Sequence, residues 1–416
     1  MMYNSVFVAL IGVLLFGYVL DRVLDALNLK HILPVLPEEL SGIFDQEEYQ
    51  KSQLYKRDNI RFSFFTSSVS LAVMLPIFFL GGFGWLDAVL KGLTDNYIIH
   101  VLLFFGLLAL VSDILTTPFS VYNTFVLEER YGFNRTNVRT FILDKIKAWI
   151  LGAVIGGGLL ALITWIYMLT GKWFWLVALG VVTLFSLFMT MFYSNLIVPL
   201  FNKQTPLEEG SLRSNIEAFA LKVSFKLDNI YVMDGSKRSS KANAYFTGLG
   251  PKKRIVLFDT LIHDLEDEEI VAVLAHEVGH YKKKHTTTGL IIGTIQMAIT
   301  FYLFSLFVGT DSFAVALGGE EASFHLGLVA FGILYSPISL LIGLGTNAFS
   351  RHNEYQADRF ARKEFNADRL VSSLKKLSKN NLSNLTPHPV YVFFHYSHPP
   401  LLQRIRAMKG KSVAGH

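Results

Sequence analysis

Seven long apolar stretches constrain this chain more than any other feature of its sequence. They cover residues 5–24, 64–86, 98–118, 148–170, 173–200, 289–310 and 323–347. A helix needs roughly 20 apolar residues to cross a bilayer core about 30 Å thick. Charged residues make up only 17% of the chain and apolar residues 51%, whereas a typical soluble domain has roughly 25% charged residues. The sequence therefore predicts an integral membrane protein with seven helical spans.

The first and last stretches need separate arguments. The first begins near Met1, but it has no basic segment before it and no small-residue cleavage site, so we expect a retained helix rather than a signal peptide. The sixth and seventh stretches are the weakest of the set, because Pro337 and several glycines interrupt the last one.

The basic residues predict a sidedness. If seven spans alternate, 36 of the 38 Lys and Arg residues fall on one side of the membrane, and only Lys91 and Lys172 fall on the other. Counting the short loops alone still gives 11 against 2, and such an excess marks the cytoplasmic side. This topology explains the pI of about 9.0. We therefore expect the lipid bilayer, and no nucleic acid, as a partner.

The sequence His276-Glu277-x-x-His280 carries the clearest chemical signal. The chain has no cysteine, so any metal must be held by His, Asp or Glu. Two histidines four residues apart lie on one face of a helix, where their imidazoles can bind one zinc ion. Glu277 beside them can act as a general base toward water. The alternative is an exposed amphipathic helix, but chance produces this motif only about 0.01 times per chain.

A third ligand is expected from a second helix. The segment 350–365 has a helical pattern and places Glu354 and Asp358 four residues apart on one face. From spacing alone either carboxylate could bind the metal, and the other could hold a ligating histidine by its free N–H. A surface helix with acidic and basic pairs is the simpler interpretation of this segment alone.

Taken together, these motifs resemble the type I CaaX prenyl protease family of integral-membrane zinc endopeptidases. The resemblance rests on "AHEVGHYKKKH" and "NEYQADRFA", and also on "LIVPLFNKQTPLEEGSLRSNIE" (196–217), "SSKANAYFTGLG" (239–250) and "SHPPLLQRI" (397–405). It implies one zinc ion per chain with His276, His280 and Glu354 as ligands. It also implies Glu277 as the base and Asp358 as a partner of a ligand.

Four further residues take roles from the resemblance. Asn243 and Ala244 fall on an edge strand that would hydrogen-bond an extended substrate backbone. His398 and Arg404 would lie near the site and stabilise the oxyanion or bind the terminal carboxylate of a peptide. The simpler interpretations are a plain strand and turn, and a loop before a basic helix. His285 also fits the family pattern, without an assigned role.

The resemblance also implies an architecture. We expect an all-α membrane protein whose seven helices surround an intramembrane chamber, with a cytoplasmic-side α+β protease domain. Residues 1–200 would hold spans one to five, 201–288 the edge strand and HExxH helix, 289–347 spans six and seven, and 348–416 the third ligand and substrate-site residues. The compact length favours a bacterial inner membrane, or the endoplasmic reticulum membrane if the source is eukaryotic.

Two rival functions remain open at this stage. The expected substrate is a peptide or protein cut near its C-terminus, either a prenylated CaaX-type chain or another membrane-associated one. A quality-control protease of the heat-shock HtpX type shares the metal motif, but it is usually shorter and has fewer spans. A metal-sensing transporter would explain Asp113 inside a span, but it leaves Glu277 without a role.

Overall fold

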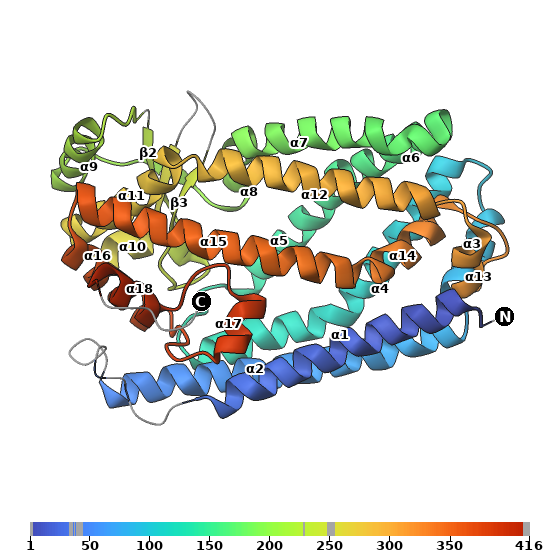
Figure 1. Ribbon diagram of the computed structural model, residues 1–416, viewed down its shortest axis with the longest axis horizontal. Helices are drawn as coiled ribbons and strands as arrows, with labels where there is room; N and C mark the ends of the chain where they lie inside the picture. The colour runs from blue at the N-terminus through green and yellow to red at the C-terminus, as the bar shows by residue number, and fades with distance from the viewer. Residues whose placement is uncertain are drawn as a thin grey trace.

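The computed structural model describes residues 3–32, 36, 38, 45–227, 229–247 and 254–410, apart from the side chains of Lys172 and Thr247. The last three residues of the 239–250 motif lie outside these ranges. Long helices run along the molecule between two ends (Figure 1). A small sheet and short helices form one end, which we call the sheet end, and α3 and α13 lie at the other, which we call the far end (Figure 1).

The predicted seven spans are confirmed. Six helical segments are long and apolar enough to cross a membrane, and a bent pair makes a seventh. They are α1 (Ser5–Lys30), α2 (Gln46–Phe79), α4 (Tyr97–Tyr122) with η2 (Asn123–Glu128), α5 (Val138–Leu151) with η3 (Gly152–Gly157) and α6 (Gly158–Thr170), α7 (Phe174–Leu196) with α8 (Val198–Phe201), α12 (His285–Phe307), and α14 (Phe324–Leu334) with α15 (Ser336–Glu364).

The second span begins and ends earlier in the chain than predicted. The apolar run predicts residues 64–86, but α2 begins at Gln46 and ends at Phe79. Its polar first half is helical as well, and Gly81 then takes a left-handed backbone conformation with φ of 66° that ends the run. Glycine adopts this conformation without a Cβ clash. A separate helix, α3 (Gly82–Lys91), follows at the far end.

The seventh span bends where the sequence predicts an interruption. The axes of α14 and α15 differ by 52°, and Pro337 occupies the first turn of α15, where its missing N–H costs nothing. Helix α15 then continues without a break to Glu364. The span and the 350–365 segment are therefore one helix, and the proposed boundary at residue 348 falls inside it. The boundary at 288/289 likewise falls inside α12.

The spans form a closed ring. Helix α1 contacts α2 and α14, α14 contacts α12, α12 contacts α7, and α7 and α4 both contact α6. Aromatic pairs between α2 and α4, such as Phe62 with Tyr122, close the circuit. Only 6–17% of the residues in each apolar window are buried. Most residues of the spans therefore face either the outside of the ring or the space within it.

A large apolar cluster closes the ring at the far end. It draws residues from α1, α2, α3, α4, α6, α7, α12, α13 (Asp311–Ala316) and α14. Its largest fully buried members are Phe78, Phe104, Phe174 and Phe324. Such aromatic contacts bury much apolar area, so this cluster fixes the ends of the spans opposite the sheet.

The sheet end carries the predicted α+β domain. Its four strands, β1 (Gln204–Pro206), β2 (Asn229–Met233), β3 (Ala244–Thr247) and β4 (Arg254–Phe258), run in the order β1-β2-β4-β3. Only the β2–β4 pair is parallel. The surrounding helices are α9 (Ser211–Lys222), η5 (Gly235–Lys237), α10 (Asp259–Asp264), α11 (Asp267–Lys282), α16 (Ala367–Asn380), α17 (Pro389–His395) and α18 (Leu401–Met408). The short η4 (Gly171–Trp173) lies between α6 and α7.

A buried carboxylate anchors α11 in this domain. Glu269 is 1% exposed and completes a capping box with Glu266. It accepts hydrogen bonds from Ser372 and Lys376 of α16 at 2.6 and 2.8 Å. Burial tends to raise the pKa of Glu269, but the bonds from Lys376 and Ser372 outweigh burial and hold the pKa below its ordinary value. The ionised form of Glu269 therefore stabilises the domain.

We expect Glu269→Ala to destabilise the protein by about 1–2 kcal/mol, because a helix cap and two buried hydrogen bonds are lost. Thermal unfolding of the detergent-solubilised protein measures this as a lower Tm. Since the folded-state pKa is depressed, the effect is full above the ordinary glutamate pKa and disappears as the pH falls through the folded-state value. Glu268→Ala, on the same turn but exposed, is the control. Equal losses from both variants would contradict the assignment.

Candidate metal centre

The candidate site forms where α11 crosses α15. The two helices approach closely at Gly279, where an added Cβ would lie 3.1 Å from Cα of Ala357 and 3.2 Å from its carbonyl oxygen. A larger residue would require the helices to shift by a few tenths of an ångström, because such contacts are tighter than most real Cβ contacts. This close crossing brings one turn of α11 against the turn of α15 that carries Glu354.

Three ligand atoms converge at the crossing. Nε2 of His276 lies 3.1 Å from Nε2 of His280. Glu354 places Oε2 3.4 Å from the first of these nitrogens and Oε1 3.2 Å from the second. Tetrahedral zinc with bonds of 2.0–2.1 Å separates its ligands by about 3.3 Å. The spacing therefore matches a metal site, and it selects Glu354 over Asp358 as the third candidate ligand.

The donor set also fits a cation electrostatically. His276 and Glu354 are buried, and Oε2 of Glu354 has no hydrogen-bond partner among the described residues. Two imidazole nitrogens that face each other at 3.1 Å need a proton or a cation between them. Oε2 has only longer contacts, 3.4 Å to Nε2 of His276 and 3.7 Å to Nη1 of Arg404, and a divalent cation would satisfy all three groups at once.

Asp358 and Arg404 support the first histidine. Nδ1 of His276 lies 2.9 Å from Oδ1 of Asp358, and Arg404 donates two hydrogen bonds of 2.6 and 2.9 Å to the same carboxylate. Burial lowers the pKa of His276, but its hydrogen bonds to Asp358 and Glu354 outweigh burial and raise the pKa to about 9. An incoming metal must therefore displace a proton from this ring. The guanidinium of Arg404 is already committed to Asp358.

His285 supports the second histidine in the same way. It lies at the start of α12, and its Nδ1 is 3.0 Å from Nδ1 of His280. One ring can donate a hydrogen bond to the other through these nitrogens, which leaves Nε2 of His280 free to face a metal. Sequence reasoning gave His285 no role, although its spacing of five residues from His280 was visible.

A cavity of about 720 Å³ opens beside these residues. Glu277 lines it from α11, and among the described residues its carboxylate has no hydrogen bond or ion pair. The cavity extends along the spans, where polar residues missed by the sequence analysis face it, namely Gln296 of α12 and Thr346 of α15. The signal for them was present, since polar residues inside apolar spans often mark functional surfaces.

The predicted substrate-side residues also reach the cavity. Asn243 precedes the edge strand β3, and its side-chain oxygen accepts a hydrogen bond from its neighbour's backbone, the N–H of Ala244, at 2.9 Å. Nε2 of His398 lies 3.3 Å from Oε1 of Glu354. Asn243, Ala244, His398 and Arg404 all line the cavity. The structure thus brings together every site residue that the sequence predicted.

Asp113, a charged residue inside a span, is the main argument for a transporter. Asp113 in α4 accepts hydrogen bonds from Lys145 at 2.8 Å and from the indole of Trp149 at 3.2 Å. Its charge is therefore compensated within the wall of the ring. The arrangement removes the main observation in favour of a transporter.

Comparisons with known proteins identify the family of the chain. Residues 26–203 match the family model described as CAAX prenyl protease N-terminal, five membrane helices, and residues 206–412 match peptidase family M48. A CAAX prenyl protease 1 homolog of Arabidopsis thaliana is 38% identical over 410 residues, which cover 96% of this chain and 97% of the relative. CAAX prenyl protease 1 of Saccharomyces cerevisiae is 36% identical, with coverage of 94% and 91%.

A solved structure shares the fold. The crystal structure of S. mikatae Ste24p superposes with a TM-score of 0.91 at 33% identity and covers 97% of this chain and 99% of that chain. Because the plant relative has nearly the same length, the compactness of this chain is no indication of a bacterial source.

We expect His285→Ala to weaken zinc binding about 10–100-fold, because loss of the group that orients a ligating histidine has effects of that size. Competition between the protein and a chromogenic chelator measures the affinity. His352→Ala, an exposed histidine on α15, is the matched control. Unchanged zinc affinity in His285→Ala would show that the contact with His280 does not orient the ligand.

Proposed function

This chain belongs to peptidase family M48, in its CAAX prenyl protease branch, and is a membrane metalloprotease; from that premise we propose that it uses zinc and the base Glu277 to cut peptide bonds near the C-terminus of prenylated CaaX-type or other membrane-associated substrates. The observation that carries the proposal is the metal-like spacing of His276, His280 and Glu354 next to Glu277 in one cavity. Zinc held by these three side chains would supply a Lewis acid at the scissile carbonyl.

The residues around the ligands supply the remaining chemistry. Glu277 takes a proton from the attacking water and passes it to the leaving amine. His398, whose side chain is 65% exposed beside Glu354, can donate a hydrogen bond to the developing oxyanion. Arg404 is better suited to hold Asp358 and His276 in place than to bind the substrate carboxylate, because two of its donors already bind Asp358.

The edge strand supports an extended substrate. Helix α11 and β3 both contribute to the cavity, and β3 pairs with β4 on one side only. The N–H of Ala244 bonds to the side chain of Asn243, which a substrate carbonyl can replace. An added peptide strand would then lie along β3 with its scissile bond close to the metal ligands.

The shape of the cavity supports a membrane-tethered substrate. Its lining continues from the HExxH helix to Gly289, Ile292 and Gly293 of α12 and to Phe349 of α15. Apolar and small residues on this side can accept a lipid chain attached next to the cut site. A quality-control protease of the HtpX type would require no such lining.

The proposed orientation places the sheet end in the cytoplasm. Helices α1 and η2 end, and α2 begins, at the sheet end (Figure 1). The segments 22–61, 119–147, 201–288 and 348–416, which include these helix ends and the sheet domain, carry 36 of the 38 Lys and Arg residues. The rule that short basic loops remain cytoplasmic supports this orientation. The membrane would be the bacterial inner membrane or, in a eukaryote, that of the endoplasmic reticulum.

The first test uses Glu277→Gln and a farnesylated peptide ending in a CaaX sequence. We expect the parent protein to release the last three residues and the variant to lose at least about 100-fold in rate, because general-base catalysis contributes 10²–10⁴-fold. Mass spectrometry follows the release, and zinc content confirms that the variant keeps its site. Glu268→Gln on the same helix is the control.

Two outcomes would contradict parts of this proposal. Full activity of Glu277→Gln would remove Glu277 as the base. No release by the parent protein with its zinc present would remove the CaaX substrate, and unlipidated or misfolded membrane proteins would then be tested instead.

A second test concerns the edge strand. We expect Ala244→Pro to raise KM at least tenfold with zinc content unchanged, because proline removes one N–H offered to the substrate but is tolerated at the first residue of an edge strand. Ala244→Ser keeps the N–H and is the control. Equal KM values for the two variants would exclude strand pairing at this position.

A further inference from the structure

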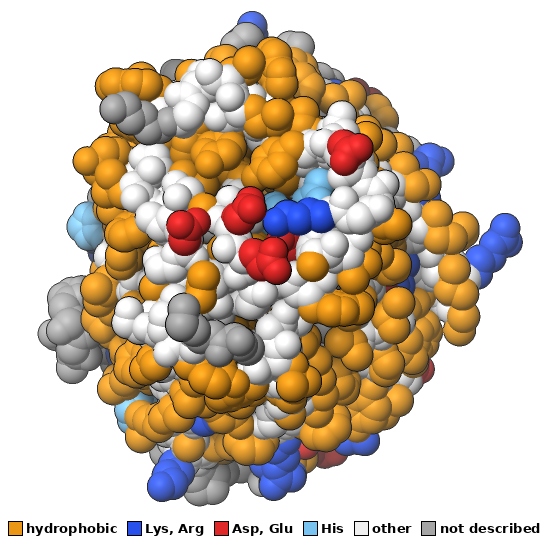
Figure 2. Space-filling model, turned by 90° about the vertical axis from the view of Figure 1, so that its right-hand side faces the viewer, with side chains coloured by type: hydrophobic (Ala, Val, Ile, Leu, Met, Phe, Trp, Pro, Cys, Tyr) orange, Lys and Arg blue, Asp and Glu red, His pale blue; other side chains and the backbone are white. Residues whose placement is uncertain are grey.

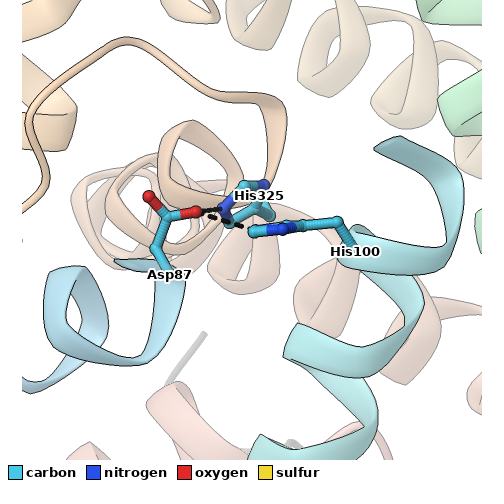
Figure 3. A group of neighbouring side chains, drawn as sticks. All are labelled: Asp87, His100 and His325. Atoms are coloured by element: carbon cyan, nitrogen blue, oxygen red, sulfur yellow. Dashed lines mark hydrogen bonds and ion pairs between the residues drawn. The ribbon is translucent and has the colours of Figure 1, made fainter. Parts of the chain in front are cut away.

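A second cluster of metal-binding side chains lies at the far end of the ring. Asp87 on α3, His100 in the second turn of α4 and His325 at the start of α14 are 2%, 4% and 1% exposed. They come from three elements and point toward one another (Figure 3). The protease site uses none of them, and they lie at the opposite end of the spans from α11 (Figure 1).

The two imidazoles of this cluster converge on one carboxylate oxygen. Nε2 of His100 and Nε2 of His325 lie 2.8 and 2.7 Å from the same oxygen, Oδ1 of Asp87. The three atoms lie within 4.8 Å of one another. The hydroxyl of Ser323 is a possible fourth donor atom, 3.4 Å from Nε2 of His325. The other oxygen, Oδ2, lies 3.3 Å from Lys91, so both rings share Oδ1 and converge on it.

We propose that Asp87, His100 and His325 form a second divalent-cation site, which takes zinc and holds α3, α4 and α14 together. Two imidazoles and one carboxylate are a donor set that zinc favours. Its ligand separation of about 3.3 Å requires each nitrogen to move roughly 0.5 Å from the carboxylate oxygen, which small side-chain rotations provide. Ser323 or a solvent molecule would complete the coordination.

The surroundings leave the rings able to bind a metal. Without a metal, Nε2 of His325 donates its proton to Oδ1 of Asp87 at 2.7 Å. Nδ1 is buried and has no hydrogen-bond partner among the described residues, so no other contact prevents the proton from moving to Nδ1 when Nε2 binds a cation. Lys91 lies 3.3 Å from Oδ2 of Asp87, and its side chain is 47% exposed. It can swing into solvent when a cation binds the other oxygen.

The surface above the cluster favours cations. Figure 2 shows this end of the molecule, where acidic side chains surround a basic one within a mostly apolar surface and a histidine is visible between them. The exposed acidic residues of the far-end loops and α13 are Asp95, Asp311, Glu320 and Glu321. Asp95 precedes His100 by five residues, and Glu321 precedes His325 by four. Clustered negative charge raises the local concentration of cations.

A metal here would hold α14 against α3 and α4 at the far end of the ring. Helix α14 continues through the bend into α15, which carries Glu354. A cation that fixes α14 against α3 and α4 therefore fixes the starting point of the helix that supplies the third protease ligand. The site would be structural, because the cluster lies apart from the cavity that holds Glu277.

The experiment measures zinc per chain in the purified full-length protein after dialysis against free zinc. We expect two zinc ions in the parent protein. We expect one in the variant Asp87→Asn/His100→Asn/His325→Asn, one in His276→Ala/His280→Ala, and none when all five changes are combined. His263→Ala removes an exposed histidine of α10 and should keep both ions.

The outcomes separate this site from the protease site. A parent protein that binds one zinc ion, lost in His276→Ala/His280→Ala, would overturn the second site and keep the first. A second zinc ion that remains bound after the three changes at the cluster would also overturn the proposal, because that ion must then be bound elsewhere. Zinc lost only through changes at the cluster would support the second site and remove the proposed protease centre.

A conservative variant covers the case in which the triple variant fails to fold. Lys91→Gln removes the cation that competes for Asp87 and leaves the three ligands intact. Bound zinc should then show higher affinity and a larger zinc-dependent rise in Tm than in the parent protein. Both proteins carry His276→Ala/His280→Ala in this comparison, so that zinc at the protease site does not contribute. A Tm that does not depend on zinc in either protein would show that the cluster is a hydrogen-bonded ion pair and not a metal site.

Discussion

The close crossing of α11 and α15 at Gly279 and Ala357 is the contact on which the function of this protein depends. Neither helix holds a complete site. Helix α11 supplies two imidazoles and the proposed base Glu277, and α15 supplies the third candidate ligand together with Asp358. Since ligand separations of about 3.3 Å suit zinc, a shift of one ångström between the helices would remove the match. A residue without a Cβ at the crossing makes this spacing sterically accessible.

A membrane protease must admit water to its site, because hydrolysis needs water and the lipid core excludes it. The spans form a ring in which few residues are buried, closed at the far end by aromatic side chains. At the sheet end the ring opens into a cavity shared by the spans and the protease domain. Because α15 is both a span and a ligand helix, the site is held at the boundary between the two environments.

Both histidines among the three proposed ligands of the protease site contact a partner outside the ligand set. Asp358, held by Arg404, orients His276, and His285 orients His280. Such partners set the tautomer of each ring. The arrangement explains why residues far apart in the sequence, on α11, α12, α15 and α18, must fold together before a metal can bind. It also assigns Arg404 a structural task that its charge alone did not indicate.

The sequence by itself determined the number of spans, the clustering of basic loops on one side and the HExxH helix, because these depend on local length, composition and periodicity. It also named the candidate ligands, base and substrate-side residues, partly through a resemblance to a family that the comparisons confirm. Spacing alone left Glu354 and Asp358 open and the resemblance favoured Glu354. The tertiary structure supports that choice, because it places Glu354 against both histidines, whereas Asp358 contacts the far nitrogen of His276. It alone brought Asp87, His100 and His325 together, because contacts between residues up to 238 positions apart leave no local periodic signal.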